Sequence, residues 1–260
     1  MVSFNLKYSD QGAGQPVVMV HGFPLNRRMW DDDLAVLGKR CRVIAPDLPG
    51  FGESVPGTEA FTMERCADDL EALLSAMQLQ QKIVLLGLSM GGYISFEFVR
   101  KYQERLRALV LVATHPFPDS DSTRQGRYET AEFVRQKGSA ALAERLIPKF
   151  LGKTSLEAKP QVVERLRRLI SSTSSDSIAN ACLGLASRRD STHLLPQISV
   201  PTLIVAGGED TLIPREQTEH IHRGVANSRF VVVQECGHIV NLEQPAEFQN
   251  VVLQFLRELV

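Results

Sequence analysis

A serine between two glycines, where an apolar run meets a helical pattern, is the residue of this chain best placed to do chemistry. Ser89 lies in Gly-Leu-Ser-Met-Gly, residues 87–91, after the apolar run Ile83–Leu86 and before a helical pattern over Met90–Tyr102. So tight a strand-to-helix turn strains the serine backbone, and glycines on either side prevent side-chain collisions. We therefore predict that Ser89 is a nucleophile, held clear of a sheet at the amino end of a helix.

A serine hydroxyl becomes a strong nucleophile only when a base removes its proton, and His238 is the predicted base. Where such a turn belongs to a triad, the chain order is serine, acid, histidine. His238 follows the last predicted strand, and Gly237 permits a tight loop before it. Asp210, after the strand predicted over Thr202–Ala206, is expected to hold the imidazole in the correct tautomer. Its neighbour Glu209 is the alternative acid.

The negative charge that develops on an attacked carbonyl oxygen needs backbone N–H donors. One is expected from Met90, the residue after the nucleophile. The other is expected from Phe23, in the loop His21–Pro24 that follows the apolar run Val17–Val20. Because both donors belong to the backbone, the identities of these two side chains are secondary.

Short apolar runs alternate with helical patterns along most of the chain. The runs are continuous rather than alternating, which is typical of buried parallel strands. Strands alternating with helices predict an α/β fold with a mainly parallel sheet. The expected strands are Val17–Val20, Val43–Ala45, Ile83–Leu86, Leu109–Ala113, Thr202–Ala206 and Phe230–Val233, and the expected helices are Met63–Met77, Met90–Tyr102 and Pro245–Leu259.

The alternation stops between His115 and Pro196, where only helical periods appear. Such an insertion predicts a helical cap over the carboxyl edge of the sheet, where open α/β sheets bind ligands. We therefore divide the chain into a core, residues 1–114 and 197–260, and a helical cap, residues 115–196. The candidate cap helices are Glu129–Lys137, Ser139–Phe150, Gln161–Ser171 and Ser177–Ser187.

Taken in order, these motifs resemble the α/β-hydrolase superfamily over nearly the whole chain. His21–Pro24 is similar to its oxyanion loop, and Asp47–Ser54 to its Asp-x-x-Gly-x-Gly-x-Ser segment. Residues 87–92 resemble its nucleophile turn, and residues 207–210 and 237–245 its acid and histidine loops. The resemblance implies an α/β-hydrolase fold, with helices flanking the sheet and a helical cap inserted after the sixth strand.

Within the superfamily, Gly-Leu-Ser-Met-Gly-Gly is most similar to small carboxylesterases and 3-oxoadipate enol-lactonases. This implies hydrolysis of a carboxylic ester or lactone through an acyl-enzyme on Ser89. Dehalogenases and epoxide hydrolases of this fold carry aspartate where this chain has Ser89, which argues against their chemistry. Carbon–carbon bond hydrolases commonly carry tryptophan where this chain has Ile239, so that alternative is weaker but open. Cofactor-free haloperoxidases share the triad, and a non-catalytic ligand receptor is a further alternative.

Composition and length agree with a small-molecule enzyme. The chain has 260 residues and a net charge of −1, without a basic stripe that would suggest nucleic acid. The longest apolar runs are strand-sized and the start lacks the features of a signal peptide, so we expect a cytoplasmic protein that does not bind membranes. We expect no metal or organic cofactor. Whether the protein is a monomer or a homodimer stays open. Four isolated cysteines are expected to be reduced and packed, namely Cys41, Cys66, Cys182 and Cys236.

Other residues that could carry chemistry have simpler interpretations. Asp31–Asp33 is expected to fill the first turn of a helix, where negative charge complements the dipole. Arg188 and Arg189 are expected on a solvated face of the cap, with a carboxylate-binding role as the alternative. The following are expected in the core, with a pocket-lining role as the alternative: Met29, Trp30, Phe117 and Phe150.

Overall fold

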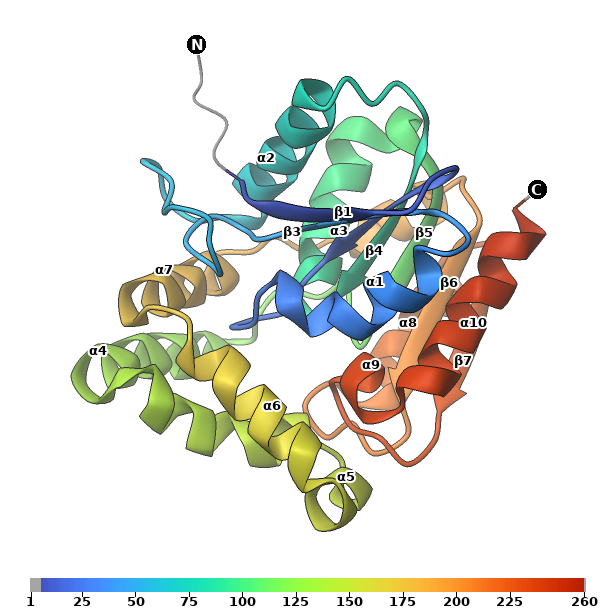
Figure 1. Ribbon diagram of the computed structural model, residues 1–260. Coiled ribbons are helices and arrows are strands. Elements are labelled where there is room, and N and C mark those ends of the chain that lie inside the picture. Colours follow the sequence, from blue (N-terminus) through green and yellow to red (C-terminus); the bar gives the residue numbers. More distant parts are fainter. Residues whose placement is uncertain (1–5, 260) are drawn as a thin grey trace.

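The computed structural model describes residues 6–259 and folds them around one mainly parallel sheet with helices on both faces (Figure 1). This is the α/β architecture that the sequence predicts. Within the described residues the sheet has seven strands. They are β1 (Tyr8–Gln11), β2 (Pro16–Val20), β3 (Arg42–Pro46), β4 (Ile83–Leu88), β5 (Leu106–Val112), β6 (Thr202–Gly207) and β7 (Ser228–Val233).

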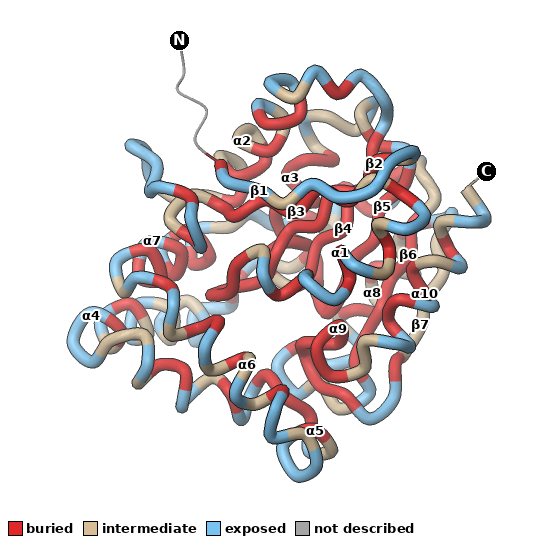
Figure 2. The backbone as a smooth tube through the Cα atoms, viewed as in Figure 1, coloured by how far each residue is buried: buried red, intermediate tan, exposed pale blue. Residues whose placement is uncertain are grey.

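The strands lie in the order β1-β3-β2-β4-β5-β6-β7, and every neighbouring pair is parallel except β1 with β3. Strands β2, β4 and β6 are buried at every residue, because helices cover both faces of the sheet (Figure 2). This double coverage explains why the sequence shows continuous apolar runs at these strands.

Strand β1 is the strand that the apolar runs do not predict. Its residues, Tyr-Ser-Asp-Gln, are exposed or half-buried, and it pairs only with β3, at the edge of the sheet. An edge strand needs no second apolar face, so its sequence carries little strand signal.

Two groups of helices cover the two faces of the sheet. Helices α2, α3 and α8 pack on one face, and α1, α9 and α10 pack on the other. These core helices are α1 (Asp31–Leu37), α2 (Met63–Ala76), α3 (Met90–Tyr102), α8 (Arg215–Gly224), α9 (Val240–Glu243) and α10 (Pro245–Glu258), and short 3-10 turns cover Arg27–Trp30, Gln103–Arg105 and Thr192–Gln197. In the described part of the chain, no helix is both long enough and apolar enough to cross a bilayer.

The face that carries α1 and α10 also holds two of the candidate pocket residues. Met29 and Trp30 are fully buried there, and the Trp30 ring stacks on Phe248 with the ring centroids 6.2 Å apart. Both are therefore core residues, as expected. Asp31–Asp33 fills the first turn of α1, also as expected, although Asp33 is buried rather than solvated.

Between β5 and β6 the described chain forms a group of helices at one end of the molecule (Figure 1). These helices are α4 (Asp121–Phe150), α5 (Lys153–Ala158), α6 (Pro160–Ser171) and α7 (Ser175–Ala186). Helix α4 is two helices joined at Gly138, whose φ of 84° breaks the helix where the sequence predicts a boundary. The short α5 was not predicted.

The position of this insertion corrects one expectation. It follows β5, the fifth strand of residues 6–259, and not the sixth.

Candidate active site

The turn between β4 and α3 holds Ser89 in a strained conformation. Its φ of 54° and ψ of −111° lie outside the regions that residues with side chains normally adopt. A Cβ added at Gly87 would lie 2.3 Å from the Gly91 carbonyl oxygen, and one at Gly91 would lie 2.3 Å from the carbonyl oxygen of Val20. Both glycines are therefore required by backbone contacts. The strain leaves the Ser89 side chain on the wall of a pocket.

In the loop after β7, His238 is paired with Asp210. The His238 Nδ1 lies 2.8 Å from Asp210 Oδ2, and both side chains are 1% exposed. The other carboxylate oxygen of Asp210 accepts the backbone N–H groups of Leu212 and Ile213 at 2.9 and 3.0 Å. Since Nδ1 donates to Asp210, Nε2 is the ring nitrogen that remains free to take a proton.

Glu209, the alternative acid, points away from the imidazole. It accepts the backbone N–H of Thr154 at 2.9 Å and the Thr154 hydroxyl at 2.6 Å, and Thr154 lies in α5. These hydrogen bonds hold the pKa of Glu209 below its usual value. Glu209 therefore attaches α5 to the core, and the geometry favours Asp210 as the partner of His238.

A buried carboxylate that the sequence analysis did not assign shapes the loop before His238. Glu243 is 1% exposed and accepts the backbone N–H groups of Gly237, Ile239 and Gly152 at 3.0, 3.2 and 2.8 Å. The His238 N–H in turn donates to the Phe150 carbonyl oxygen at 2.8 Å. The loop that carries the imidazole is therefore fixed from both α9 and the end of α4. The family-like segment Asn241–Pro245 was the available signal for this role.

The two predicted oxyanion donors lie beside Ser89. Phe23 and Met90 line the same pocket as Ser89, and within residues 6–259 neither backbone N–H has an acceptor. The loop that carries Phe23 is anchored by His21, whose Nε2 accepts the N–H of Leu48 at 3.1 Å and whose Nδ1 lies 3.0 Å from the Gly22 carbonyl oxygen. Burial lowers the pKa of His21, so its ring is neutral and serves as a structural connection.

The pocket beside Ser89 has a volume of about 550 Å³ and brings together parts of the chain that are far apart in sequence. Leu212 and Ile213, which follow Asp210, line it, and so does Phe150, whose ring centroid is 5.5 Å from that of His238. Among the described residues, His238 is hydrogen-bonded to Asp210 but not to Ser89. Contacts between nucleophile and base are often long in the absence of substrate.

Two aromatic residues meet the alternative expectation of a pocket-lining role. Phe150 is a buried core residue, as expected, and also lines the pocket, whereas Phe117 is half-buried and lines the pocket instead of lying in the core. Phe117 lies on the segment between β5 and α4, and Phe150 ends α4, so both face the space between sheet and insertion. Periodicity does not distinguish such positions from core positions, because both are apolar.

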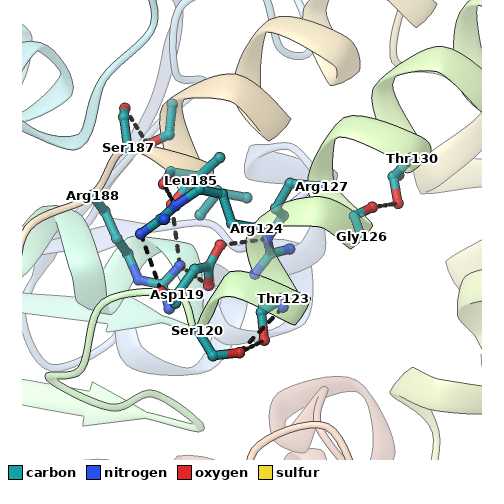
Figure 3. A network of polar contacts seen from close by, with 12 residues as sticks. Asp119, Ser120, Thr123, Arg124, Gly126, Arg127, Thr130, Leu185, Ser187 and Arg188 are labelled. Carbon is teal, nitrogen blue, oxygen red and sulfur yellow. Dashed lines mark hydrogen bonds and ion pairs between the residues drawn. The ribbon is translucent and has the colours of Figure 1, made fainter.

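Arg188 corrects a second expectation. Its side chain is only 4% exposed and lies in the pocket wall, whereas Arg189 is 56% exposed, so only Arg189 lies on a solvated face as predicted. The Arg188 guanidinium pairs with Asp119 and lies 4.2 Å from the centre of the Tyr93 ring. Arg127, from α4, pairs with the other oxygen of Asp119 (Figure 3). Asp119, Arg127 and Arg188 come from separate segments of the chain, so no sequence motif predicts this cluster of charges.

Comparison of the chain with known proteins identifies its family. Residues 15–245 match the family described as the alpha/beta hydrolase fold, and the chain belongs to this family. The predicted resemblance is confirmed.

Several members of the family are similar over almost their full length. A thermophilic esterase from Thermogutta terrifontis, solved with malate bound, is 43% identical, with 98% of this chain and 93% of that chain covered and a TM-score of 0.95. The enol-lactonase from Burkholderia xenovorans LB400 is 25% identical, with coverage of 97% and 96% and a TM-score of 0.89. The pimeloyl-[acyl-carrier protein] methyl ester esterase of Neisseria meningitidis is 26% identical over 257 residues, 94% of each chain.

Proposed function

We propose that this enzyme is a serine hydrolase that cleaves a small carboxylic ester or lactone through an acyl-enzyme on Ser89. The observation that carries the proposal is the strained Ser89 on the wall of a pocket that also contacts the His238–Asp210 pair through Phe150, Leu212 and Ile213. Relatives named as esterases and an enol-lactonase, which act on ester bonds, support the same reaction class.

The first half of the proposed reaction forms the acyl-enzyme. His238 Nε2 takes the hydroxyl proton of Ser89 as the serine oxygen bonds to the carbonyl carbon of the substrate. The negative charge that passes to the carbonyl oxygen is bound by the backbone N–H groups of Phe23 and Met90. When this tetrahedral intermediate collapses, the carbon–oxygen bond to the alcohol breaks, and the alcohol leaves with the proton from His238.

The second half releases the acid. A water molecule gives a proton to His238 Nε2 and attacks the acyl carbon, and the bond to Ser89 breaks as its oxygen regains the proton. Asp210 stabilises the imidazolium formed in each half. In this proposal residues 115–196 act as a cap, which supplies Phe117 and Phe150 to the pocket and limits the entry of water.

Hydrolysis of p-nitrophenyl butyrate tests the proposal. We expect Ser89→Ala and His238→Gln each to lower kcat by on the order of 10³-fold or more, because the nucleophile and the base act as a unit. Arg189→Gln, on the exposed face of the insertion, is the matched control and should retain the wild-type rate. Turnover that is unchanged in Ser89→Ala would remove Ser89 as the nucleophile and leave the ligand-receptor alternative.

A further inference from the structure

The pocket that contains Ser89 carries an excess of positive charge. Three cationic side chains line it, Arg127, Lys149 and Arg188, and Asp119 is its one carboxylate among the described residues, which leaves a net charge of +2. The imidazole of His115 also lines the pocket but adds no charge, since burial and the nearby Arg188 lower the pKa of His115 to about 3. Binding of a neutral ester does not require this excess of positive charge.

Lys149 is exposed and has no ion pair among residues 6–259, whereas the two arginines differ in how far the protein already uses them. Arg188 donates to the carbonyl oxygens of Phe117 and Leu185 at 3.3 and 3.2 Å and pairs with Asp119, so it is mostly committed to the wall. Arg127 donates to Asp119 through Nε alone, at 3.2 Å (Figure 3). Within residues 6–259 its two terminal nitrogens have no acceptor, and its side chain is 25% exposed. Paired terminal N–H groups match the two oxygens of a carboxylate.

A second unused donor lies in the same pocket. The backbone N–H of Phe117 donates to His115 Nδ1 at 3.2 Å, which places the ring proton of the neutral imidazole on Nε2. His115 Nε2 therefore donates to the Tyr93 hydroxyl oxygen, 3.1 Å away, and the Tyr93 O–H has no acceptor in the described chain. Tyr93 and Arg127 line the same pocket, so an anion bound there would find donors on both residues that the described chain does not use.

We infer that the substrate carries a carboxylate, separate from the ester bond that is cleaved, and that Arg127 is the residue that selects for it. The inference rests on the proposed ester hydrolysis at Ser89 and names the substrate class of that site. Asp119 holds the Nε edge of Arg127, which leaves the two terminal nitrogens of this pocket-lining residue without an acceptor in residues 6–259, and Arg188 pairs with the other oxygen of Asp119.

Kinetics with a matched pair of esters test the inference. Monomethyl glutarate carries a carboxylate, whereas methyl valerate has the same number of acyl carbons and none. We expect the wild-type enzyme to have the higher kcat/KM with monomethyl glutarate. In Arg127→Gln this preference should fall by about tenfold to hundredfold, the usual range for loss of a hydrogen bond to a charged group. Arg127→Lys, which keeps the charge but not the paired geometry, should retain part of the preference.

Arg124→Gln is the control variant. Arg124 belongs to the same turn of α4 and contacts the backbone carbonyl oxygens of Asp119 and Ala186, but it does not line the pocket. It should therefore keep the wild-type preference. A wild-type enzyme that favours methyl valerate, or an Arg127→Gln variant that loses activity equally on both esters, would overturn the inference.

Binding separates this inference from the proposed reaction. Calorimetry of glutarate with Ser89→Ala needs no turnover, and we expect binding that Ser89→Ala/Arg127→Gln lacks and that methyl valerate, which has no carboxylate, does not reproduce. Arg127-dependent glutarate binding without hydrolysis of either ester would support the anion site and overturn the ester reaction. Ester hydrolysis without glutarate binding would support the reaction and overturn the anion site.

Discussion

At the scale of single residues, two adjacent carboxylates show how position decides role. Asp210 reaches His238 Nδ1 at 2.8 Å, whereas Glu209 reaches Thr154 in α5. Both are acids after the same strand, and only the direction of the side chain separates them. A carboxylate that contacts the imidazole fixes its tautomer and stabilises its charged form, and one that contacts the amino end of a helix does neither.

The first prediction follows from this difference. Asp210→Asn should lower kcat with p-nitrophenyl butyrate by on the order of 10³- to 10⁴-fold, because the imidazole loses its tautomer partner. Glu209→Gln should lower kcat by less than about tenfold, since the amide oxygen still accepts from Thr154. Steady-state kinetics of both variants decide the assignment, and the opposite ranking would make Glu209 the acid.

Asp33 is a buried carboxyl that has no cationic partner among residues 6–259. It accepts the side-chain N–H groups of Asn241 and Gln249 at 2.9 and 3.0 Å, and burial raises the pKa of Asp33 to about 7. The Oδ1 of Asn241 is buried without a partner in the described residues. The site therefore accommodates a neutral, protonated side chain more easily than a carboxylate.

The second prediction uses that raised pKa. Between pH 4 and pH 7 folded Asp33 holds a proton that unfolded Asp33, with a pKa near 3.8, releases, so the stability contributed by this group falls as pH rises. The free energy of unfolding of wild type should therefore decrease relative to Asp33→Asn, with a slope of at most about 1.4 kcal/mol per pH unit.

Urea unfolding of both proteins across this pH range measures the difference. Wild type must be compared with Asp33→Asn because the titration of His115 changes the stability of both proteins in the opposite direction. The pKa of His115 is lowered to about 3, so the stability that it contributes is lost as pH falls below its unfolded value near 6.5. A difference between wild type and Asp33→Asn that does not vary with pH would contradict the raised pKa.

The sequence predicts some of these residues and not others, for a physical reason. Ser89, Asp210 and His238 each follow a strand in a motif of local spacing, so their places at one sheet edge follow from chain order. Asp119 and Arg188 lie 69 positions apart and meet only through the packing of α4 and α7. No local pattern encodes that contact.

At the scale of elements, glycines show where helices are constrained and where they are not. Gly91 lies in the first turn of α3 against the backbone of β2, whereas Gly126 lies inside α4 with no atom within 4 Å of an added Cβ. A glycine in an open helical position has more conformational freedom to lose on folding than alanine has.

The third prediction contrasts these two positions. Gly126→Ala should raise the free energy of unfolding by about 0.5–1 kcal/mol, because alanine favours the helix and nothing obstructs its methyl group. Gly91→Ala places a methyl group 2.3 Å from the Val20 carbonyl oxygen and should prevent folding or abolish activity. Thermal unfolding with activity measurements tests both, and a destabilised Gly126→Ala would contradict the open position.

The sequence predicts those strands and helices whose composition is set mainly by burial. Apolar runs locate β2 to β7 within a few residues, since burial on both faces sets their composition. This prediction fails at β1, whose order comes from pairing with β3, and at α5, whose six residues are too few to show a helical period. At β1 the missing information lies in a partner elsewhere in the chain, and at α5 it lies in the short length of the element.

At the scale of the whole molecule, the insertion and the histidine loop meet at three glycines. A Cβ at Gly152 would lie 2.7 Å from the Gly237 nitrogen and 2.4 Å from a carboxylate oxygen of Glu209, and one at Gly207 would lie 1.9 Å from the Gly237 carbonyl oxygen. Core and insertion are therefore in backbone contact beside His238.

The fourth prediction is that pushing the insertion away from the histidine loop displaces the imidazole of His238. Gly152→Ala should lower kcat/KM with p-nitrophenyl butyrate by up to about a hundredfold, because a small displacement of a reacting group has effects of that size. The φ of Gly152 is −66°, so alanine adds a steric conflict without backbone strain. Lys153→Ala, at an 82% exposed side chain, is the control, and equal activities of the two variants would show that the contact is not needed.

Burial of all four cysteines has a practical consequence. Burial raises the pKa of Cys41 to about 11, that of Cys182 and Cys236 to about 12, and that of Cys66 well above its ordinary value. Since the thiolate is the species that alkylating reagents attack, the natural sulfurs should stay unlabelled at neutral pH. A single Leu156→Cys, at an exposed position in α5, would therefore accept a maleimide fluorophore on the wild-type background. Fluorescence from that position would report on any displacement of α5 relative to the core during turnover.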